Sequence, residues 1–390
     1  MGNSTIASIS VGISLLVMIL AITITDGFKW EIKERATALM GDIAVGAPGI
    51  EVTTEQYPIH PSPETIKQLQ EIEGVKEVYR NLYRRAIIKE GDAIHGVLLK
   101  GVESNFDWSF FEGTVKEGKL PSLSDTLAAP HILLPLKIAS KLGVGVGDPL
   151  LFYFIGNSIK AKKFIVSGLF NAHLEEAEES LALVSAKVVE EINGWESGAA
   201  SSIEIHLSKR AGIEATLPQV ERILENSSTV EHLTATPVER LFPHLFDWLN
   251  LLDFNVLIII ALMIAVAGFN MLSTLLILLL ERISTIGLLK ALGMRDREIH
   301  KIFLSRAASL LAIGMGVGGS VGVLSALLQK YLKIIPLNPS NYFVDFVPIH
   351  FNWSKIVAVA FLSFVAIIAL LLLTSIFITK VSPDRSLRVK

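Results

Sequence analysis

Four long runs of apolar residues stand out from an otherwise mixed chain. They cover residues 6–24, 254–280, 302–328 and 356–378, and Arg306 is the only charged residue inside them. About 20 apolar residues are enough for a helix to cross the hydrocarbon core of a bilayer. The pattern therefore predicts four transmembrane helices, the second of them long enough to tilt or to protrude from the bilayer.

The first run also has the length of a signal-peptide core, which would be removed from the mature protein. It lacks a basic segment in front of it, and it ends in Ile24-Thr25-Asp26-Gly27 without a small-x-small cleavage pattern. We therefore predict that the first run is an uncleaved membrane anchor.

Basic residues in the short segments predict the orientation of the chain. The link 281–301 carries five Lys or Arg residues, and the segment 380–390 carries four more. Short basic segments of membrane proteins stay in the cytoplasm. Three basic residues at 29–35 argue the other way, but they precede a long domain, where this rule has little force. We expect both termini in the cytoplasm and residues 28–247 outside.

The segment 28–247 is soluble in character, and strand-like and helix-like patterns alternate along it. Gly91-Asp92 joins two strand patterns and predicts a hairpin. Alternating strands and short helices are typical of α+β layers, so we expect one large or two small subdomains, the second at 118–200. Strands are expected at 75–89, 93–102, 131–135, 150–154, 164–166 and 202–207, and helices at 66–74, 137–142 and 213–224.

Both edges of this soluble segment have a helical pattern. Residues 28–39 continue the first run, and residues 240–253 lead into the second. Two interpretations stay open. The two helices form a stalk that lifts the domain off the membrane, or they lie flat with Trp30 and Trp248 in the headgroup layer.

The predicted fold class is an α-helical membrane protein with four transmembrane helices and a large α+β domain between the first and second spans. Its predicted segments are a first span (1–27), the α+β domain with stalk helices (28–247), a second span (248–280), a connecting helix (281–300), a third span (301–330), a short loop (331–353), a fourth span (354–379) and a tail (380–390).

Composition excludes several classes of function. The chain is 51% hydrophobic and 19% charged, with a net charge of -3, which gives no support for nucleic-acid binding. It has no cysteine, and its nine histidines form no H-x-x-x-H pair, so no metal site is predicted. Four glutamates at 175–179 predict an exposed turn, with a divalent-cation site as the alternative. Neither G-x-x-x-x-G-K-S/T nor a Ser/His/Asp set with a nucleophile elbow is visible, so we expect no catalysis by this chain.

Glycines recur every four residues in the third apolar run, at Gly314, Gly318 and Gly322. Small residues at this spacing let two membrane helices approach closely. A phosphate-binding loop would need a preceding strand and a lysine. We therefore predict that these glycines serve helix packing.

The link between the second and third runs predicts a short amphipathic helix. Ile283, Ile286, Leu289 and Leu292 recur at helical spacing, and Gly293 is placed to end the helix. Periodicity alone leaves two interpretations open. The helix conveys a push from a soluble partner into the membrane, or it floats in the headgroup layer.

Residues 281–303 resemble the coupling segment of the FtsX/MacB-like permease superfamily, in which a helix reading I-x-x-L-K-A-L-G precedes a basic turn and the next span. Four further stretches are similar to lipoprotein-releasing permeases of the LolC/LolE type. They are residues 26–31, 139–148, 265–271 and 382–388. The resemblance covers nearly the whole chain in order and spacing.

This resemblance implies a MacB-like periplasmic domain and a location in the bacterial inner membrane. It implies a second permease, identical or homologous, and a LolD-type ATPase dimer that binds ATP and Mg, so that this chain itself binds no cofactor. The implied activity is ATP-driven release of lipoproteins toward the periplasm and outer membrane, with handover to a LolA-type chaperone. The link 155–163 is shorter than the chaperone-recruiting hairpin of the family, so we expect chaperone capture by the partner permease.

Two alternatives from the same superfamily remain. A MacB-like permease would drive export of peptides or drugs from the periplasm, and an FtsX-like regulator would switch a cell-wall hydrolase. The size of segment 28–247 favours the transporters over the regulator.

The resemblance also implies roles for individual residues. The residues expected to couple to the ATPase are Glu281, Arg282, Ile286, Leu289, Lys290, Leu292, Gly293, Met294 and Arg295. The residues expected along the substrate path are Phe28, Phe254, Phe269 and Asn270. No residue is expected to be catalytic or to bind a metal.

Overall fold

The computed structural model describes residues 3–91, 93–123, 130–156, 159–172, 180–208, 211–227, 232–338, 342 and 344–375. The chain divides into two compact units. The helical unit comprises residues 1–31, 247–338 and 344–390, and the sheet unit comprises residues 32–246 with 339–343. The predicted tail 380–390, the end of the fourth span and the glutamate cluster 175–179 lie outside the described residues.

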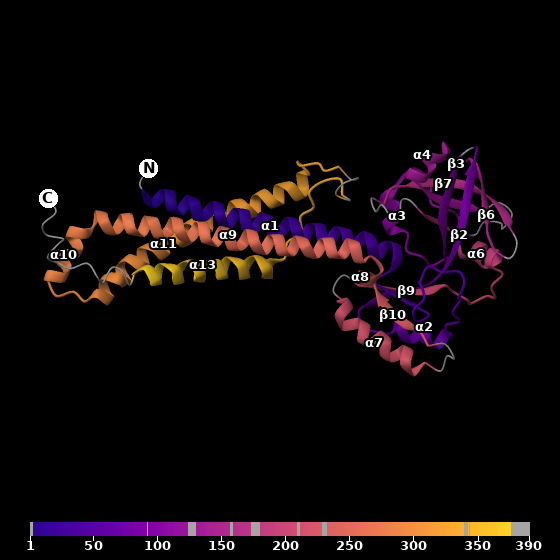
Figure 1. Cartoon of the computed structure of the whole chain (residues 1–390), viewed down its shortest axis with the longest axis horizontal. Coiled ribbons are helices and arrows are strands. Elements are labelled where there is room, and N and C mark those ends of the chain that lie inside the picture. The colour runs from indigo at the N-terminus through magenta and orange to yellow at the C-terminus, as the bar shows by residue number, and fades with distance from the viewer. Residues whose placement is uncertain are drawn as a thin grey trace. The chain divides into compact units, whose positions relative to one another are not determined.

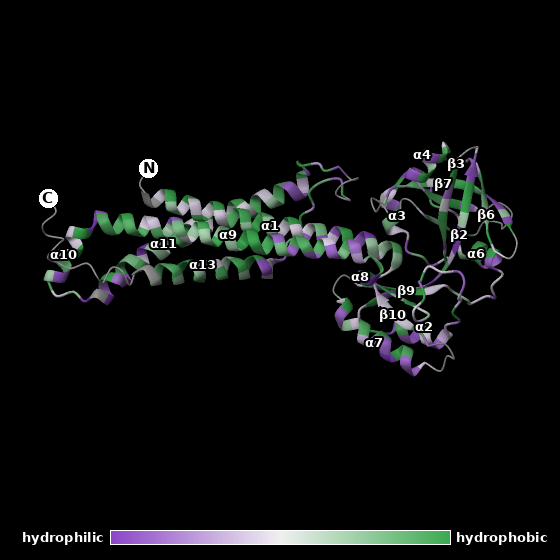
Figure 2. Ribbon diagram, viewed as in Figure 1, coloured by the Kyte–Doolittle hydropathy of each residue, from purple (hydrophilic) through white to green (hydrophobic). Residues whose placement is uncertain are grey.

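The described part of the helical unit is built from four long helices and one short helix (Figure 1). The long helices are α1 (Asn3–Met40), α9 (Pro243–Glu281), α11 (Asp296–Leu332) and α13 (Trp353–Ser375), and α10 (Ile283–Ala291) connects α9 to α11. All four long helices are long and apolar enough to cross a membrane. Figure 2 shows hydrophobic residues along most of their length. Helix α1 continues as one helix into the sheet unit.

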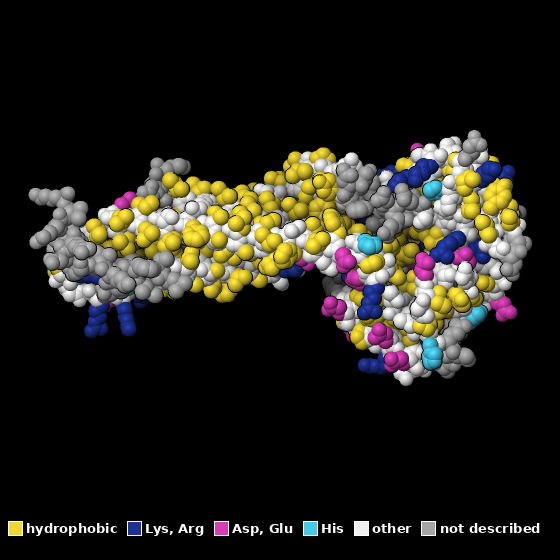
Figure 3. Space-filling model, in the orientation of Figure 1, with side chains coloured by type: hydrophobic (Ala, Val, Ile, Leu, Met, Phe, Trp, Pro, Cys, Tyr) yellow, Lys and Arg dark blue, Asp and Glu magenta, His cyan; other side chains and the backbone are white. Residues whose placement is uncertain are grey.

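The helices of this unit pack through buried apolar side chains. One group joins all four long helices through residues such as Ala7, Met271, Leu311 and Leu371. Many outward-facing side chains are apolar as well, and they cover much of the helical surface in Figure 3. Soluble monomers rarely expose so large an apolar surface, so the surroundings of these helices must be lipid or another apolar partner.

The described strands of the sheet unit form one ten-stranded sheet in the order β10-β1-β9-β2-β3-β8-β5-β7-β4, with β6 paired to β2 and β7. The strands are β1 (Ile43–Gly46), β2 (Val75–Glu90), β3 (Ala93–Val102), β4 (Val115–Gly118), β5 (His131–Pro135), β6 (Pro149–Phe154), β7 (Lys160–Phe170), β8 (Leu181–Ser185), β9 (Ser202–Leu207) and β10 (Thr234–Pro237). The short helices are α2 (Pro63–Gln70), α3 (Ser109–Thr114), α4 (Leu136–Leu142), α6 (Ala186–Asn193), α7 (Ile213–Asn226) and α8 (Val238–Leu241).

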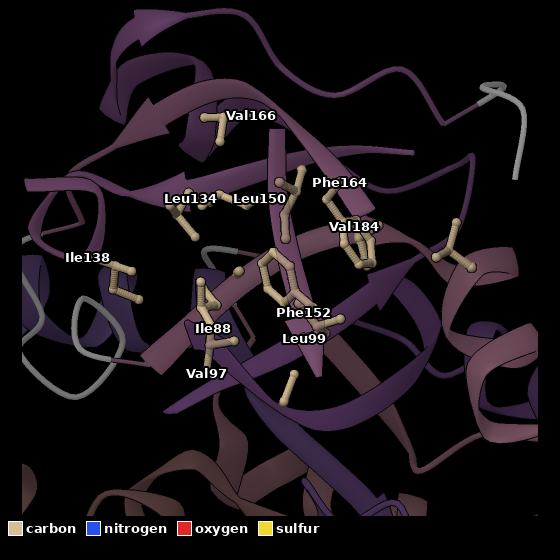
Figure 4. Packing of buried hydrophobic residues seen from close by; sticks show 14 of the residues in the cluster. Ile88, Val97, Leu99, Leu134, Ile138, Leu150, Phe152, Phe164, Val166 and Val184 are labelled. Carbon is tan, nitrogen blue, oxygen red and sulfur yellow. The ribbon is translucent and has the colours of Figure 1, made fainter. Parts of the chain in front are cut away.

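Strand β2 joins two halves of this sheet. Its first part pairs with β9, and its second part pairs with β3 and β6. Each half has its own apolar core. Figure 4 shows Leu134, Phe152 and Phe164 in the core of the half that contains β3 and β8. Ile43 and Val220 belong to the core of the β1 and β9 half.

Local patterns predict six of these strands, and burial hides two of the other four. The predicted hairpin is present, because β2 and β3 pair from Leu82 with Gly101 to Glu90 with Ala93. The strand expected at 164–166 is the centre of the longer β7. Strands β1, β4, β8 and β10 were not predicted. Strands β1 and β8 are almost wholly buried, so they lack the alternation of apolar and polar residues that marks a half-exposed strand.

Candidate functional site

Local features of the sequence explain how helix α10 ends and how the turn after it forms. Gly293 has a φ of 92°, a left-handed conformation that glycine adopts without strain. Its N–H donates to the carbonyl of Lys290, which satisfies one of the carbonyls left free at a helix end. Helix α11 follows at once, and the N–H of Arg295 donates to the Glu298 carboxylate at 3.2 Å. The link between α9 and α11 is therefore a compact helical turn rather than an extended loop.

Helix α10 has one buried side. Ile286 is 3% exposed and packs with Leu279 of α9 and Ile299 of α11. Leu288 and Leu292 lie on the outside, 58% and 77% exposed. A helix that merely floats in the headgroup layer needs no such anchor. The packing of Ile286 ties α10 to the ends of both flanking spans.

The predicted coupling residues differ in exposure. Glu281, Arg282, Leu292, Gly293 and Arg295 are exposed, Leu289, Lys290 and Met294 are half-buried, and Ile286 is buried. Leu289 is among the predicted coupling residues, and the more exposed Leu288 is not. Because Ile286 faces inward, Leu288 and Leu292, four residues apart, mark the outward face. Their coupling role stays a prediction.

The glycines of α11 lie against α1 of the same chain. A Cβ on Gly318 would overlap the backbone of Gly12, and a Cβ on Gly314 would overlap the backbone of Ser8. A Cβ on Gly322 would lie 3.2 Å from the Cα of Leu16. These glycines therefore allow close backbone approach between the first and third spans.

Helix α9 carries an exposed apolar stripe along its length. Its members recur at helical spacing and are Leu251, Phe254, Ile258, Leu262, Val266, Phe269, Leu276 and Leu280. Of the predicted path residues, Phe254 and Phe269 belong to this stripe, at 61% and 63% exposed. Asn270 is exposed and donates to the hydroxyl of Ser10 on α1. Phe28 of α1 meets Trp248 of α9 edge to face, with ring centroids 6.5 Å apart.

A buried ion pair in the sheet unit holds the C-terminal end of α1. Lys100 of β3 and Glu204 of β9 are 0% and 1% exposed, and Lys100 Nζ lies 2.8 Å from both carboxylate oxygens. Lys100 also donates to the carbonyl of Leu39 in the last turn of α1. Tyr83 OH on β2 donates to Glu204 Oε1 at 2.9 Å. A cation is favourable at a helix C-terminus, so the pair fastens α1 to both halves of the sheet.

Burial and charge act against each other in this cluster. Burial lowers the pKa of Lys100, and the Glu204 carboxylate opposes that effect. Burial by itself would raise the pKa of Glu204, but the charges of Lys100 and His206 and their hydrogen bonds outweigh it, so the pKa of Glu204 is lowered. The contact of Lys100 with both oxygens is that of an ammonium and a carboxylate, so we treat the pair as ionised. Among the residues that the structure describes, no group of three or more His, Asp or Glu side chains could hold a metal ion.

The chain matches two protein families. The MacB-like periplasmic core domain matches residues 4–223, and the FtsX-like permease C-terminal domain matches residues 257–383. The first match spans more than half of the chain, so the chain belongs to the MacB-like periplasmic core domain family. The second match covers the segment from α9 to α13.

Similar proteins share nearly the whole length of the chain. The lipoprotein-releasing system transmembrane protein LolC of Xylella fastidiosa (strain Temecula1) is 24% identical, covering 85% of this chain and 78% of its own. LolC of Neisseria meningitidis serogroup B is 23% identical, covering 98% of this chain and 92% of its own. LolE of Haemophilus influenzae is 22% identical, covering 95% and 89%. The resemblance drawn from the sequence is thereby confirmed, and the chain is a multi-pass ABC transporter permease of the FtsX-like type.

Proposed function

We propose that this protein is the permease subunit of a transporter that releases lipoproteins from the inner membrane toward the periplasm and outer membrane. ATP hydrolysis by a separate ATPase drives the release. The observation that carries this proposal is similarity along almost the entire chain to proteins named for the lipoprotein-releasing system, up to 99% of this chain and 93% of the relative. The similarity includes the sheet unit as well as the spans.

The exposed stripe of α9 suits an acylated substrate. Each CH₂ group that leaves the bilayer costs about 0.8 kcal/mol, so extraction of a multiply acylated protein needs an energy source and an apolar surface. Phe254 and Phe269 offer such a surface, with the polar Asn270 beside it. The substrate path therefore runs along α9 and α1, and Phe28 lies on the same helix pair near Trp248.

In the proposed topology both termini are cytoplasmic, and the MacB-like core domain lies in the periplasm between the first and second spans. The basic residues of the α9–α11 link support this orientation. A reporter active only in the cytoplasm should work when fused after Lys390 and stay silent when inserted at Gly156. The reverse pattern would contradict the topology.

We assign three partners to the complex. A LolD-type ATPase dimer, which binds ATP and Mg, docks on the exposed residues around α10, and a second permease, identical or homologous, completes the membrane part. Strand β6 ends at Phe154 and β7 begins at Lys160, so the connection between them is short. A LolA-type chaperone is therefore captured by the partner permease rather than by this chain.

Release from vesicles tests the function. The permease is reconstituted with its ATPase and the second permease in vesicles that contain a triacylated lipoprotein, and lipoprotein in the soluble fraction is measured with ATP and with a non-hydrolysable analogue. We expect release only with ATP and a soluble chaperone.

The match to the MacB-like core domain over residues 4–223 favours one alternative, export of peptides or drugs from the periplasm. ATP hydrolysis that is stimulated by such a molecule, while the lipoprotein stays in the vesicles, would establish that alternative and contradict lipoprotein release.

A further inference from the structure

A run of exposed apolar residues begins at the end of α11 and continues into its connection with α13. Tyr331 and Leu332 are 77% and 63% exposed, and Ile334 and Ile335 are 61% and 54% exposed. Lys330 precedes the run and Lys333 lies within it. Four exposed apolar side chains within five residues are unfavourable in water, so this surface needs an apolar neighbour.

Backbone polar groups of Ile335 and Leu337 are paired within the protein. The N–H of Ile335 donates to Gln329 Oε1 at 3.1 Å. The Ile335 carbonyl accepts from the N–H of Val347 at 3.1 Å, and Leu337 N–H donates to the carbonyl of Asp345 at 2.9 Å. Gln329 is itself buried, at 7% exposed. Internal pairing of irregular backbone is what an environment without water demands.

Contacts within the helical unit place this connection at the edge of the hydrocarbon layer. Lys355 Nζ of α13 lies 2.6 Å from Asp26 Oδ1 of α1. Charged groups are costly deep in a bilayer, so this pair marks the polar end of both spans. The connection reaches α1 at the same level, because His350 N–H donates to the carbonyl of Thr23 at 3.1 Å.

Lysine and aromatic side chains meet at this level. Lys333 Nζ lies 4.2 Å from the ring centroid of Phe346, and Lys330 Nζ lies 5.8 Å from that of Phe351. Trp353 stacks on Phe351 with centroids 5.3 Å apart. Aromatic rings and long cationic side chains gather where headgroups meet acyl chains, and lysines there attract lipid phosphates.

We propose that residues 330–337 form an interfacial foot that sits in the lipid leaflet at the membrane face where α1 leaves the bilayer. Tyr331, Leu332, Ile334 and Ile335 insert between the lipids, and the two lysines bind anionic headgroups. The segment 331–353, predicted from sequence as a short periplasmic loop, is in part a lipid-binding surface. It holds the ends of α11 and α13 at a fixed depth.

Spin labels on single cysteines test the depth of the foot. The chain has no cysteine, so Ile334→Cys gives one labelled site in the full-length protein. Leu324→Cys, on the exposed face of α11 at 57%, is the control for the bilayer interior, and Ile159→Cys, 75% exposed in the sheet unit, is the control for water. In phosphatidylcholine vesicles we expect the Ile334 label to meet oxygen more often, and a soluble nickel complex less often, than the Ile159 label. Its nickel accessibility should exceed that at Leu324.

Two outcomes would overturn the proposal. Accessibilities equal to those at Ile159 would place the connection in water, and shielding from both oxygen and nickel would mean that a protein surface covers it. Ile335→Cys repeats the measurement at a second position, in case Ile334→Cys lowers the melting temperature.

The lysines are tested by lipid-dependent stability. Phosphatidylglycerol added to phosphatidylcholine vesicles should raise the melting temperature of the wild-type chain, and Lys330→Gln with Lys333→Gln should lose that rise. Lys116→Gln with Lys187→Gln removes two exposed lysines of the sheet unit and should keep it. An equal rise in both double variants would exclude headgroup binding by the foot. Neither measurement involves ATP or lipoprotein, so both are independent of the proposed transport activity.

Discussion

Lys100 and Glu204 lie 104 residues apart in the chain and meet in a fully buried contact. Moving two charges out of water is costly, and their attraction offsets that cost only when the geometry is good and further hydrogen bonds are made. The Tyr83 hydroxyl and the Leu39 carbonyl supply those bonds. Removal of one charged partner should therefore destabilise the protein more than removal of both.

We expect Lys100→Met to lower the free energy of unfolding by about 3–5 kcal/mol, because it leaves the Glu204 carboxylate buried and unpaired. Urea denaturation of the full chain in detergent measures the change. Adding Glu204→Leu should restore most of the lost stability. Lys76→Met is the control, since it removes an exposed pair with Asp107 and should cost no more than about 1 kcal/mol. Equal losses of unfolding free energy in Lys100→Met and Lys76→Met would mean that the buried pair contributes no more to stability than the exposed pair.

Tyr79 should make the sheet unit sensitive to alkaline pH. Burial raises the pKa of Tyr79 from 10.0 to about 12. A folded-state pKa above the unfolded value gives stability that is complete below pH 10 and is lost as pH rises from 10 toward 12. Tyr79→Phe should therefore flatten the decline of unfolding free energy across this window, measured by denaturation at a series of pH values. Tyr57→Phe, on an exposed phenol, should leave the slope unchanged. A wild-type slope in Tyr79→Phe would refute the assignment.

The sequence predicts residues whose conformation depends on near neighbours in the chain. It does not predict contacts that depend on the order of the strands in the sheet. Gly293 was predictable because a helix end needs a left-handed residue within a few positions. The meeting of Lys100 with Glu204 was not, because β2 lies between their strands and no spacing in the sequence encodes that order. Both residues lie in predicted strands, but the sequence alone gives them no shared site.

At the scale of elements, the contact between α1 and α11 depends on missing side chains. Gly318→Leu should push α11 away from α1, because its Cβ would overlap the Gly12 backbone. We expect a loss of about 1–3 kcal/mol or more, seen as a lower melting temperature of the full chain in detergent. Gly316→Leu is the matched control, since no described atom lies within 4 Å of the Cβ it would gain. A similar loss in both variants would show that leucine itself, rather than close approach, is responsible.

The presence of the long helices was predictable from the sequence, but which side of each helix is buried was not. Apolar runs of about 20 residues or more have few alternatives to a membrane helix, and the four runs correspond to α1, α9, α11 and α13. The same uniform hydrophobicity conceals which side is buried. In α10, Leu289 was expected to couple to the ATPase, whereas the structure half-buries it and exposes Leu288. The inward side is set by Leu279 and Ile299, which belong to other helices.

At the scale of the whole molecule, α1 takes part in contacts within both units. Ile286 ties α10 to α9 and α11, and Gly318 brings α11 against α1. In the sheet unit, Lys100 donates to the carbonyl of Leu39 in the last turn of α1. The packed elements of the helical unit give a physical route for coupling from α10 to α1, and only a perturbation with a distant readout demonstrates it.

Leu292→Asp applies such a perturbation at the proposed ATPase contact. Leu292 is 77% exposed in the permease, so the change should hardly affect folding, whereas an unpaired carboxylate in an apolar cleft of the ATPase should cost several kcal/mol. Leu289 is less suitable because it is half-buried within this chain. We expect less ATPase on the purified permease and little stimulation of ATP hydrolysis by lipoprotein in vesicles. Val146→Asp, on an exposed side chain of the sheet unit, should change neither value. If Leu292→Asp keeps wild-type values for both, the α10 segment is an idle surface helix and the coupling route starts elsewhere.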